Sequence, residues 1–201
     1  MLHNLEFYKT FEIDTPENLF KEKNSKFFGY GYPIISESEV KPLIDLLKKA
    51  HSGAGHFCYA YQIGTEIIQY RANDDGEPNN SAGLPIYGQI QSFNITNVLI
   101  VVVRYFGGTK LGVGGLILAY KKTSQLVIES ALIIEKPINI NYKIIFDYSK
   151  TSKVMRIINE NNIEIIGKEM NENCLLKIAV NKKNAKKIFD IFENSSEIKI
   201  E

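Results

Sequence analysis

The chain has 201 residues, of which 44% are hydrophobic and 23% are charged, and this composition is typical of a soluble globular protein and excludes a mainly disordered one. Lys and Arg together number 24 and Asp and Glu 23. A net charge of +1 excludes long-range attraction of the whole chain to nucleic acid or to an anionic membrane, so any basic surface must be local.

The N-terminal sequence MLHNLEFYKTFEID contains neither a positive segment nor an uninterrupted apolar one, and no later run is long enough to cross a bilayer. We therefore expect a cytoplasmic protein without membrane association. The two cysteines, Cys58 and Cys174, are far apart and neither belongs to a C-x-x-C pair. This spacing argues against a disulfide framework or a complete zinc site and predicts two reduced, partly buried thiols.

The first regular elements are a strand and a helix. The segment KFFGYGYPII (26–35) is predicted to be a strand. Apolar residues then recur at helical spacing, at Val40, Leu43, Ile44 and Leu47. Two signals compete for the start of this helix: Ser36 and Glu39 resemble a capping box, whereas Pro42 favours a start at Ser38 or later.

The middle of the chain predicts a sheet. The segments FCYAYQIG and IIQYRAN are expected to pair as strands, with Gly64 and Thr65 in the connection. A polar turn and a short helix through IYGQIQSF follow, and then the strand NVLIVVVRYF. Because residues 98–103 are all apolar, this strand is expected to be central and covered on both faces.

A long helix is predicted after the glycine-rich stretch. Its apolar stripe contains Val113, Leu116, Ile117, Tyr120, Ser124, Val127, Ile128 and Ala131. Helices around a buried strand make the first domain α/β in this interpretation.

The last third of the chain predicts the element order βαββαβ. INYKIIFDY is an alternating strand, and an amphipathic helix follows it. IEIIGKEM and CLLKIAV are strands joined at NENC by turn-forming Asn171 and Asn173, and a second helix and the strand EIKIE complete the chain. This order is that of a ferredoxin-like domain. With Pro137 as the boundary, the domains are residues 1–137 and 138–201, so the protein is predicted to be a two-domain α+β or α/β protein.

The stretch RYFGGTKLGVGGLILAY (104–120) places five of the fourteen glycines within nine positions, between a strand and a helix. Such turns often bind phosphate, but Val113 and Gly114 stand where the Walker A motif needs Lys and Ser or Thr. The dinucleotide fingerprint fails at Ile117, where it needs glycine. Two interpretations stay open: tight turns with close packing, or a bare backbone surface that binds an anion or a partner.

Two other polar groups of residues have alternative interpretations. Asp74, Asp75 and Glu77 could hold a divalent metal or could serve turn and capping chemistry, with Ser81 or Asn80 capping a helix near Ala82.

His56 and Cys58 lie on one face of a strand, as a nucleophile and its base would, or they are a half-buried histidine and a core cysteine. No third group can be assigned from the sequence to orient the imidazole. We predict no catalytic residue, no metal and no cofactor.

The second domain carries basic residues on both predicted helices. They form a candidate secondary basic patch, or else solvated helix faces: Lys150, Lys153, Arg156, Lys182, Lys183, Lys186 and Lys187.

Several of these motifs, taken in order, resemble the YigZ/IMPACT family. The segments are NDDGEP, SAGLP, NVLIVVVRYFGGTKLGVGGL and AY, preceded by the His-x-Cys of HFCYAY. The match spans about residues 25–131, and the C-terminal βαββαβ region is similar to the second domain of bacterial members. Two departures occur near the motifs: Asn80 and Ser81 replace the usual Gly and Thr, and Leu118 replaces a common Arg or Lys, which weakens an anion-binding role.

The resemblance implies an N-terminal domain with a fold seen in a ribosomal protein and in translation factors, joined to a ferredoxin-like domain. Eukaryotic members of the family act in translational control, and contact with nucleic acid or ribosomes is the usual proposal for bacterial ones. The implied binding surface, with the lysines that flank the glycines, comprises Asp75, Gly76, Glu77, Pro78, Arg104, Tyr105, Gly107, Gly108, Lys110, Gly112, Gly114, Gly115, Tyr120 and Lys121.

The expected function is therefore a non-enzymatic one, in which the protein binds RNA, the ribosome or translation factors and takes part in regulation of translation. Two alternatives stay open. One is a hydrolase that uses the acidic turn at 74–77 with His56 or Cys58, and the other is a pure protein-interaction adaptor.

Overall fold

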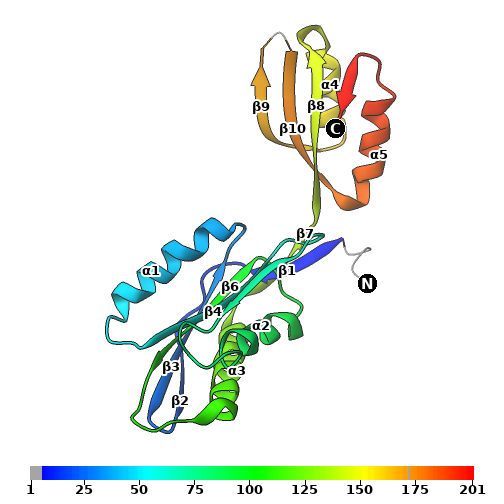
Figure 1. Cartoon of the computed structure of the whole chain (residues 1–201). Coiled ribbons are helices and arrows are strands. Elements are labelled where there is room, and N and C mark those ends of the chain that lie inside the picture. The colour runs from blue at the N-terminus through cyan, green and yellow to red at the C-terminus, as the bar shows by residue number, and fades with distance from the viewer. Residues whose placement is uncertain (1–5, 172) are drawn as a thin grey trace. The chain divides into compact units, whose positions relative to one another are not determined.

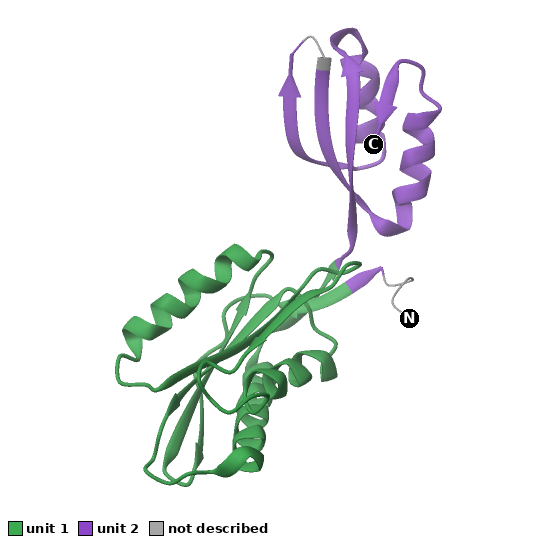
Figure 2. Cartoon of the chain, in the orientation of Figure 1, with its two compact units in different colours: residues 1–3, 8–136 green, residues 4–7, 137–201 purple. Residues whose placement is uncertain are grey.

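A computed structural model describes residues 6–171 and 173–201. The chain forms two compact units: residues 8–136 make up the first, and residues 137–201 with Glu6 and Phe7 make up the second (Figures 1 and 2). Outside the main sheets, β1 (Phe7–Phe11) and β7 (Ile133–Pro137) pair as two strands. Within the described residues, no helix is both long and apolar enough to cross a membrane.

The first unit is built on a five-stranded sheet in the order β2-β3-β6-β4-β5. The strands are β2 (Asn18–Glu22), β3 (Ser25–Pro33), β4 (His56–Ile63), β5 (Gln69–Asn73) and β6 (Val98–Tyr105). Neighbouring strands all pair antiparallel, so the unit is α+β and the expectation of an α/β domain is wrong. The apolar run of β6 reflects helices on both sheet faces and not a parallel sheet.

Strand β6 is the central strand, as predicted. Helix α1 (Val40–Ala50) covers one face of the sheet, and α2 (Gly83–Ser92) and α3 (Gly112–Ser130) cover the other (Figure 1). Because side chains alternate along a strand, Leu99, Val101 and Val103 belong to the apolar cluster on the α1 side. Val98, Ile100 and Val102 belong to the cluster on the side of α2 and α3.

Both sequence signals at the start of α1 are present. Ser36 and Glu39 form a capping box around the short 3-10 helix η1 (Glu37–Glu39). The α-helix begins immediately afterwards at Val40, which places Pro42 in its first turn, where a missing N–H is tolerated.

Helix α3 packs closely on β3 because β3 contains glycines. A Cβ built on Gly29 would lie 2.4 Å from Val127 Cγ2, and one on Gly31 would lie 2.8 Å from Val127 Cγ1. Five members of the predicted stripe are buried, whereas Val113 and Ile117 are 52% and 37% exposed and Ala131 is partly buried; the buried members are Leu116, Tyr120, Ser124, Val127 and Ile128. The first turns of α3 therefore leave part of the stripe in solvent.

The second unit has the element order that the hydrophobic pattern predicts. Its elements are β8 (Asn139–Asp147), the 3-10 helix η2 (Tyr148–Lys150), α4 (Thr151–Glu160), β9 (Glu164–Met170), β10 (Asn173–Asn181), α5 (Lys182–Glu193) and β11 (Ile198–Ile200). The antiparallel sheet has the order β11-β8-β10-β9, and both helices pack on one face of it. The turn predicted at 171–173 includes residue 172, which lies outside the described residues.

Candidate functional site

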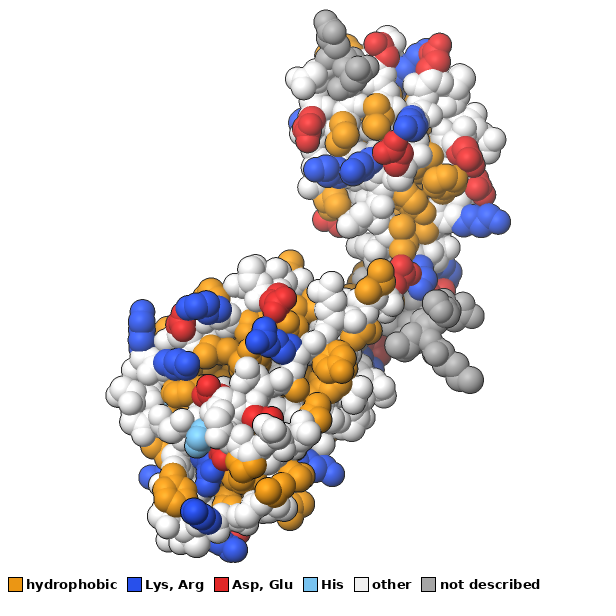
Figure 3. All heavy atoms as spheres, viewed as in Figure 1, with side chains coloured by type: hydrophobic (Ala, Val, Ile, Leu, Met, Phe, Trp, Pro, Cys, Tyr) orange, Lys and Arg blue, Asp and Glu red, His pale blue; other side chains and the backbone are white. Residues whose placement is uncertain are grey.

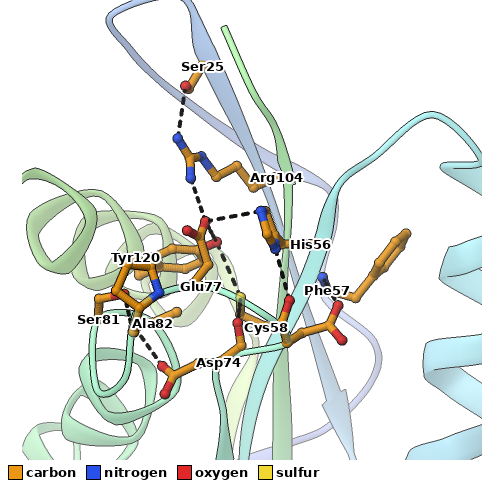
Figure 4. A network of polar contacts seen from close by, with 12 residues as sticks. Ser25, His56, Phe57, Cys58, Asp74, Glu77, Ser81, Ala82, Arg104 and Tyr120 are labelled. Carbon is orange, nitrogen blue, oxygen red and sulfur yellow. Dashed lines mark hydrogen bonds and ion pairs between the residues drawn. The ribbon is translucent and has the colours of Figure 1, made fainter. Parts of the chain in front are cut away.

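A buried polar network joins three of the motifs that stand apart in the sequence (Figure 4). Glu77, in the turn after β5, accepts hydrogen bonds through Oε1 from Arg104 Nη1 at 2.6 Å and from the Tyr120 hydroxyl at 2.8 Å. Arg104 lies near the end of β6 and Tyr120 lies on α3. None of the three side chains is more than 6% exposed, so the ion pair is shielded from water.

Cys58 belongs to the same network. Its Sγ lies 3.0 Å from the Asp74 carbonyl oxygen and 3.2 Å from Tyr120 Oη, and its single proton can be donated to either acceptor. Burial raises the pKa of the Cys58 thiol and of the Tyr120 hydroxyl, because a buried charge is poorly solvated. Both groups stay protonated at neutral pH. The structure therefore favours the core-cysteine interpretation over a nucleophile.

His56 is the partly exposed member of this network, with 26% of its side chain accessible. Its Nδ1 lies 2.8 Å from the Asp75 carbonyl oxygen. Since a carbonyl oxygen only accepts, Nδ1 carries a proton, and the orienting group that the sequence could not reveal is a backbone atom. The other ring nitrogen, Nε2, lies 4.0 Å from Glu77 Oε1.

The acidic turn is used for capping. Asp74 Oδ1 accepts hydrogen bonds from the backbone N–H groups of Ala82, at 2.9 Å, and Gly83, at 2.8 Å, and Oδ2 accepts one from Asn80. Asp74 thus caps α2 although it lies eight residues before the N-cap residue, Ala82. The prediction that Ser81 or Asn80 caps this helix is wrong, because the Ser81 hydroxyl donates to a carbonyl within the turn instead.

The other two acidic side chains of the turn are also engaged. Asp75 Oδ2 accepts a hydrogen bond from the Phe57 N–H on β4 at 2.6 Å, and Glu77 pairs with Arg104. No group of three or more His, Cys, Asp or Glu side chains that could hold a metal ion is found in the part of the chain that is described. The contacts of the three carboxylates therefore support turn and capping chemistry.

The glycine loop, residues 106–115, packs against the start of β3 on one side and faces solvent on the other. Ser25 Oγ accepts a hydrogen bond from the Gly107 N–H at 3.1 Å and lies 3.5 Å from Arg104 Nη2. A Cβ on Gly107 would overlap the backbone of Asn24, at 2.1 Å. By contrast, a Cβ on Gly108 would meet no atom within 4 Å, so this part of the loop faces solvent.

The structure divides the predicted binding surface. Glu77, Arg104 and Tyr120 are buried, so the prediction that they line an exposed surface is wrong: they neutralise and hydrogen-bond one another inside the domain. Asp75 and Tyr105 are partly buried. Gly107 and Gly115 are partly exposed. The remaining residues of the predicted surface are exposed: Gly76, Pro78, Gly108, Lys110, Gly112, Gly114 and Lys121.

Sequence reasoning missed Ser25 and the exposed apolar side chains beside the glycine loop. Ser25 contacts a residue 79 positions away, and no local pattern marks such a partner. Phe106 is 55% exposed and Leu118 is 68% exposed, and with Val113 they give the surface an apolar component. In the sequence, Leu118 stands out only because family members commonly have Arg or Lys at this position.

The predicted basic residues of the second unit lie on η2, α4 and α5. Lys150 pairs with Glu197, and Arg156 lies 3.8 Å from Glu160. Lys183, Lys186 and Lys187 are exposed on α5. Local acidic partners therefore partly neutralise Lys150 and Arg156, and the remaining members of the predicted patch are Lys153 and Lys182.

Comparison with known proteins agrees with the sequence motifs. Residues 23–128 match the model of the Impact N-terminal domain. The chain is 32% identical over 183 residues to the IMPACT family member YvyE of Bacillus subtilis, covering 91% of this chain and 82% of the relative. It is 28% identical to the IMPACT family member YigZ of Escherichia coli, covering 79% and 78%.

A solved structure extends the likeness to the whole fold. A crystal structure described as that of a hypothetical protein superposes with a TM-score of 0.77 at 21% identity, and the match covers 98% of this chain and 97% of the other. The family model alone matches more than half of the residues, and the YvyE match continues into the second unit. The chain belongs to the IMPACT family, as a bacterial YigZ-like member with an Impact N-terminal domain.

Proposed function

We propose that the protein is a non-enzymatic binding module of the translation machinery and that the glycine loop is its contact surface for RNA. The observation that carries this proposal is the loop itself: its backbone is exposed and nearly free of side chains at Gly108, Gly112 and Gly114, while Arg104 and Ser25 hold it from below. Exposed Lys110 and Lys121 can contact phosphates beside it. The resemblance to a family with members in translational control suggests the class of partner.

The proposal includes the division of the chain. Residues 1–137 would form the IMPACT domain that carries the contact surface. Residues 138–201 would form a ferredoxin-like domain, on the basis of their element order and strand order, with the lysines of α5 as a secondary contact. A protein of this kind would act in the cytoplasm.

Leu118 provides the sharpest test, because it stands where family members commonly have a basic residue. Leu118→Arg adds a cation to an exposed position beside the glycine loop and should strengthen binding to purified ribosomes at low salt.

The double variant Lys110→Gln with Lys121→Gln should weaken ribosome binding. The slope of log affinity against log salt concentration should fall by about one unit for each phosphate that is no longer neutralised. Ile13→Arg, at another exposed apolar position, and Lys136→Gln are the matched controls.

These variants can contradict the proposal. If wild-type protein binds neither ribosomes nor structured RNA at low salt, or if the loop variants bind as their controls do, the glycine loop is not an RNA contact.

A second function, that of a protein-interaction adaptor, is favoured by the exposed apolar side chains of Phe106, Val113 and Leu118. An apolar contact keeps its strength in salt that screens charges. A complex recovered from cell extract that survives high salt and nuclease, and that does not form with Phe106→Ser, would support the adaptor in place of RNA binding.

A further inference from the structure

A second concave surface lies on the other face of the sheet, between α1 and the strands β4 and β5. It is a groove of about 440 Å³, which lies within the size range of ligand sites. Its floor is formed by Phe57, Tyr59 and Tyr61 of β4 and by their cross-strand neighbours Asn73 and Arg71 of β5. Its wall is the side of α1 that carries Lys41, Ile44, Asp45 and Lys48.

The floor of the groove is aromatic and opens at Tyr59. Phe57 and Tyr61 are buried under α1, at 7% and 4% exposure, whereas Tyr59 between them is partly exposed. Side chains two residues apart on a strand stand about 7 Å apart. Aromatic side chains on an accessible sheet face are the means by which several RNA-binding modules stack unpaired bases.

One lysine of the groove is outside the close ion pairs found among the described residues. Lys41 pairs with Asp45, Arg71 lies 3.7 Å from Glu37, and the Asp75 carboxylate accepts the Phe57 N–H. Lys48 has no ion pair within the described residues and lies over the Phe57 ring, 5.6 Å from its centroid. Figure 3 shows hydrophobic side chains between basic and acidic ones over α1 and the neighbouring strands. Arg71 lies opposite Tyr61, four residues along β4 from Phe57, so it stands at the other end of the groove from Lys48.

Polar groups beside the aromatic floor remain available for hydrogen bonding. Asn73 uses its Oδ1 to accept the Asp75 N–H, but its amide NH₂ donates to no group in residues 6–171 and 173–201. The Tyr59 hydroxyl likewise has no hydrogen-bond partner in the described chain. The groove thus combines a flat ring, an amide donor, a hydroxyl and a cation.

We infer that this groove binds a nucleotide, with the base on Tyr59, its edge toward Asn73 and the phosphate toward Lys48. A planar polar base matches the aromatic floor, and a phosphate matches the unpaired lysine. The ligand is either a free nucleotide or a nucleotide within a single RNA strand. The inference does not depend on the glycine loop, because it rests on different residues on the opposite face of the sheet.

The test measures binding of fluorescein-labelled hexauridylate to the full-length protein by anisotropy at low salt, with UMP as competitor. Tyr59→Ala should weaken binding by about tenfold or more, as loss of base stacking does, whereas Tyr59→Phe keeps the ring and should retain most of the affinity. Lys48→Gln should weaken binding and reduce its salt dependence. Tyr70→Ala is the matched control, since Tyr70 is also exposed but stacks on Tyr87.

Competition by UMP would assign the groove to a free nucleotide, and its absence would assign it to a strand; both support the inference. The inference falls if wild-type protein binds neither probe, or if Tyr59→Ala and Tyr70→Ala bind hexauridylate equally well. The glycine-loop variants and Tyr59→Ala, each measured for hexauridylate binding and for ribosome binding, separate the two proposals. If the glycine-loop variants lower ribosome binding while Tyr59→Ala changes nothing, the proposed function stands and the groove does not bind nucleotide.

Discussion

At the residue scale, the buried ion pair between Glu77 and Arg104 is the feature most sensitive to mutation. Glu77→Gln removes the negative charge and leaves the Arg104 guanidinium buried without its counter-charge, and Arg104 Nε already has no hydrogen-bond partner among the described residues. Breaking one side of a buried pair costs about 3–5 kcal/mol, and we expect the free energy of unfolding to fall by about 3 kcal/mol or more. Urea unfolding at neutral pH, followed by circular dichroism, measures the change.

Two further variants serve as controls for the unfolding measurement. Glu129→Gln changes an exposed glutamate of α3 and should alter stability by less than about 0.5 kcal/mol. Tyr120→Phe removes one hydrogen bond to Glu77 and should cost about 1–2 kcal/mol. If Glu77→Gln were as stable as Glu129→Gln, the network would not stabilise the fold.

Glycines of the same loop should respond to alanine in opposite directions. Gly107→Ala places a Cβ 2.1 Å from the Asn24 backbone, so the loop or the β2–β3 turn must move and stability should fall. Gly114→Ala adds a methyl group that meets no atom within 4 Å, in the first turn of α3, and should raise stability by up to about 1 kcal/mol. Thermal unfolding of both variants checks the sign. A loss of stability in both would mean that the outer loop is also packed.

At the element scale, helix α2 depends on a cap that lies eight residues before its N-cap. Asp74→Ala removes the acceptor of the Ala82 and Gly83 N–H groups and should lower the free energy of unfolding by about 1–2 kcal/mol. Asp45→Ala, which removes an exposed i,i+4 pair on α1, should cost no more than about 0.5 kcal/mol. Equal losses in urea unfolding for the two variants would contradict the capping role.

Elements that depend on neighbouring residues could be predicted, and those that depend on distant partners could not. The capping box at Ser36 and the apolar run of β6 are local signals, and both describe the structure correctly. The sequence favours the adjacent Ser81 or Asn80 as the cap of α2, because it gives no sign that Asp74 folds back onto the helix. Periodicity places Val113 on the apolar stripe, yet its side chain is 52% exposed, because periodicity does not show which turns of a helix are covered by other elements.

At the scale of the whole molecule, the candidate site shows the same limit. The glycine loop could be located from its composition, and the apolar stripe of α3 includes Tyr120, but the burial of Arg104 could not be predicted, since its partner Glu77 comes from another segment. Taken singly, a strand-end arginine is an ordinary surface residue. Folding of the first unit brings Glu77, Arg104 and Tyr120 from three separate segments into one internal network.

The two units should differ in their response to alkaline pH, because buried tyrosines are concentrated in the first. Burial raises the pKa of Tyr32 and of Tyr61 to about 12, whereas unfolded tyrosine ionises near pH 10. Between these values the folded state keeps protons that the unfolded state has released. The stability of the first unit should therefore be unaffected below pH about 10 and should fall as pH rises toward 12, by up to about 1.4 kcal/mol per pH unit for each such tyrosine.

Each unit contains one buried cysteine, so the difference in alkaline stability between the two units can be measured within a single molecule. In mild urea, alkylation of Cys58 should accelerate relative to alkylation of Cys174 as pH rises from about 10 to 12, because the thiol of the first unit becomes accessible more often. Mass spectrometry of the two cysteine peptides measures the ratio, which cancels the general effect of pH on thiol reactivity. Tyr32→Phe and Tyr61→Phe remove the ionising hydroxyls and should reduce the acceleration at Cys58 alone. A constant ratio in the wild-type protein would show that its tyrosines ionise equally well in the folded state.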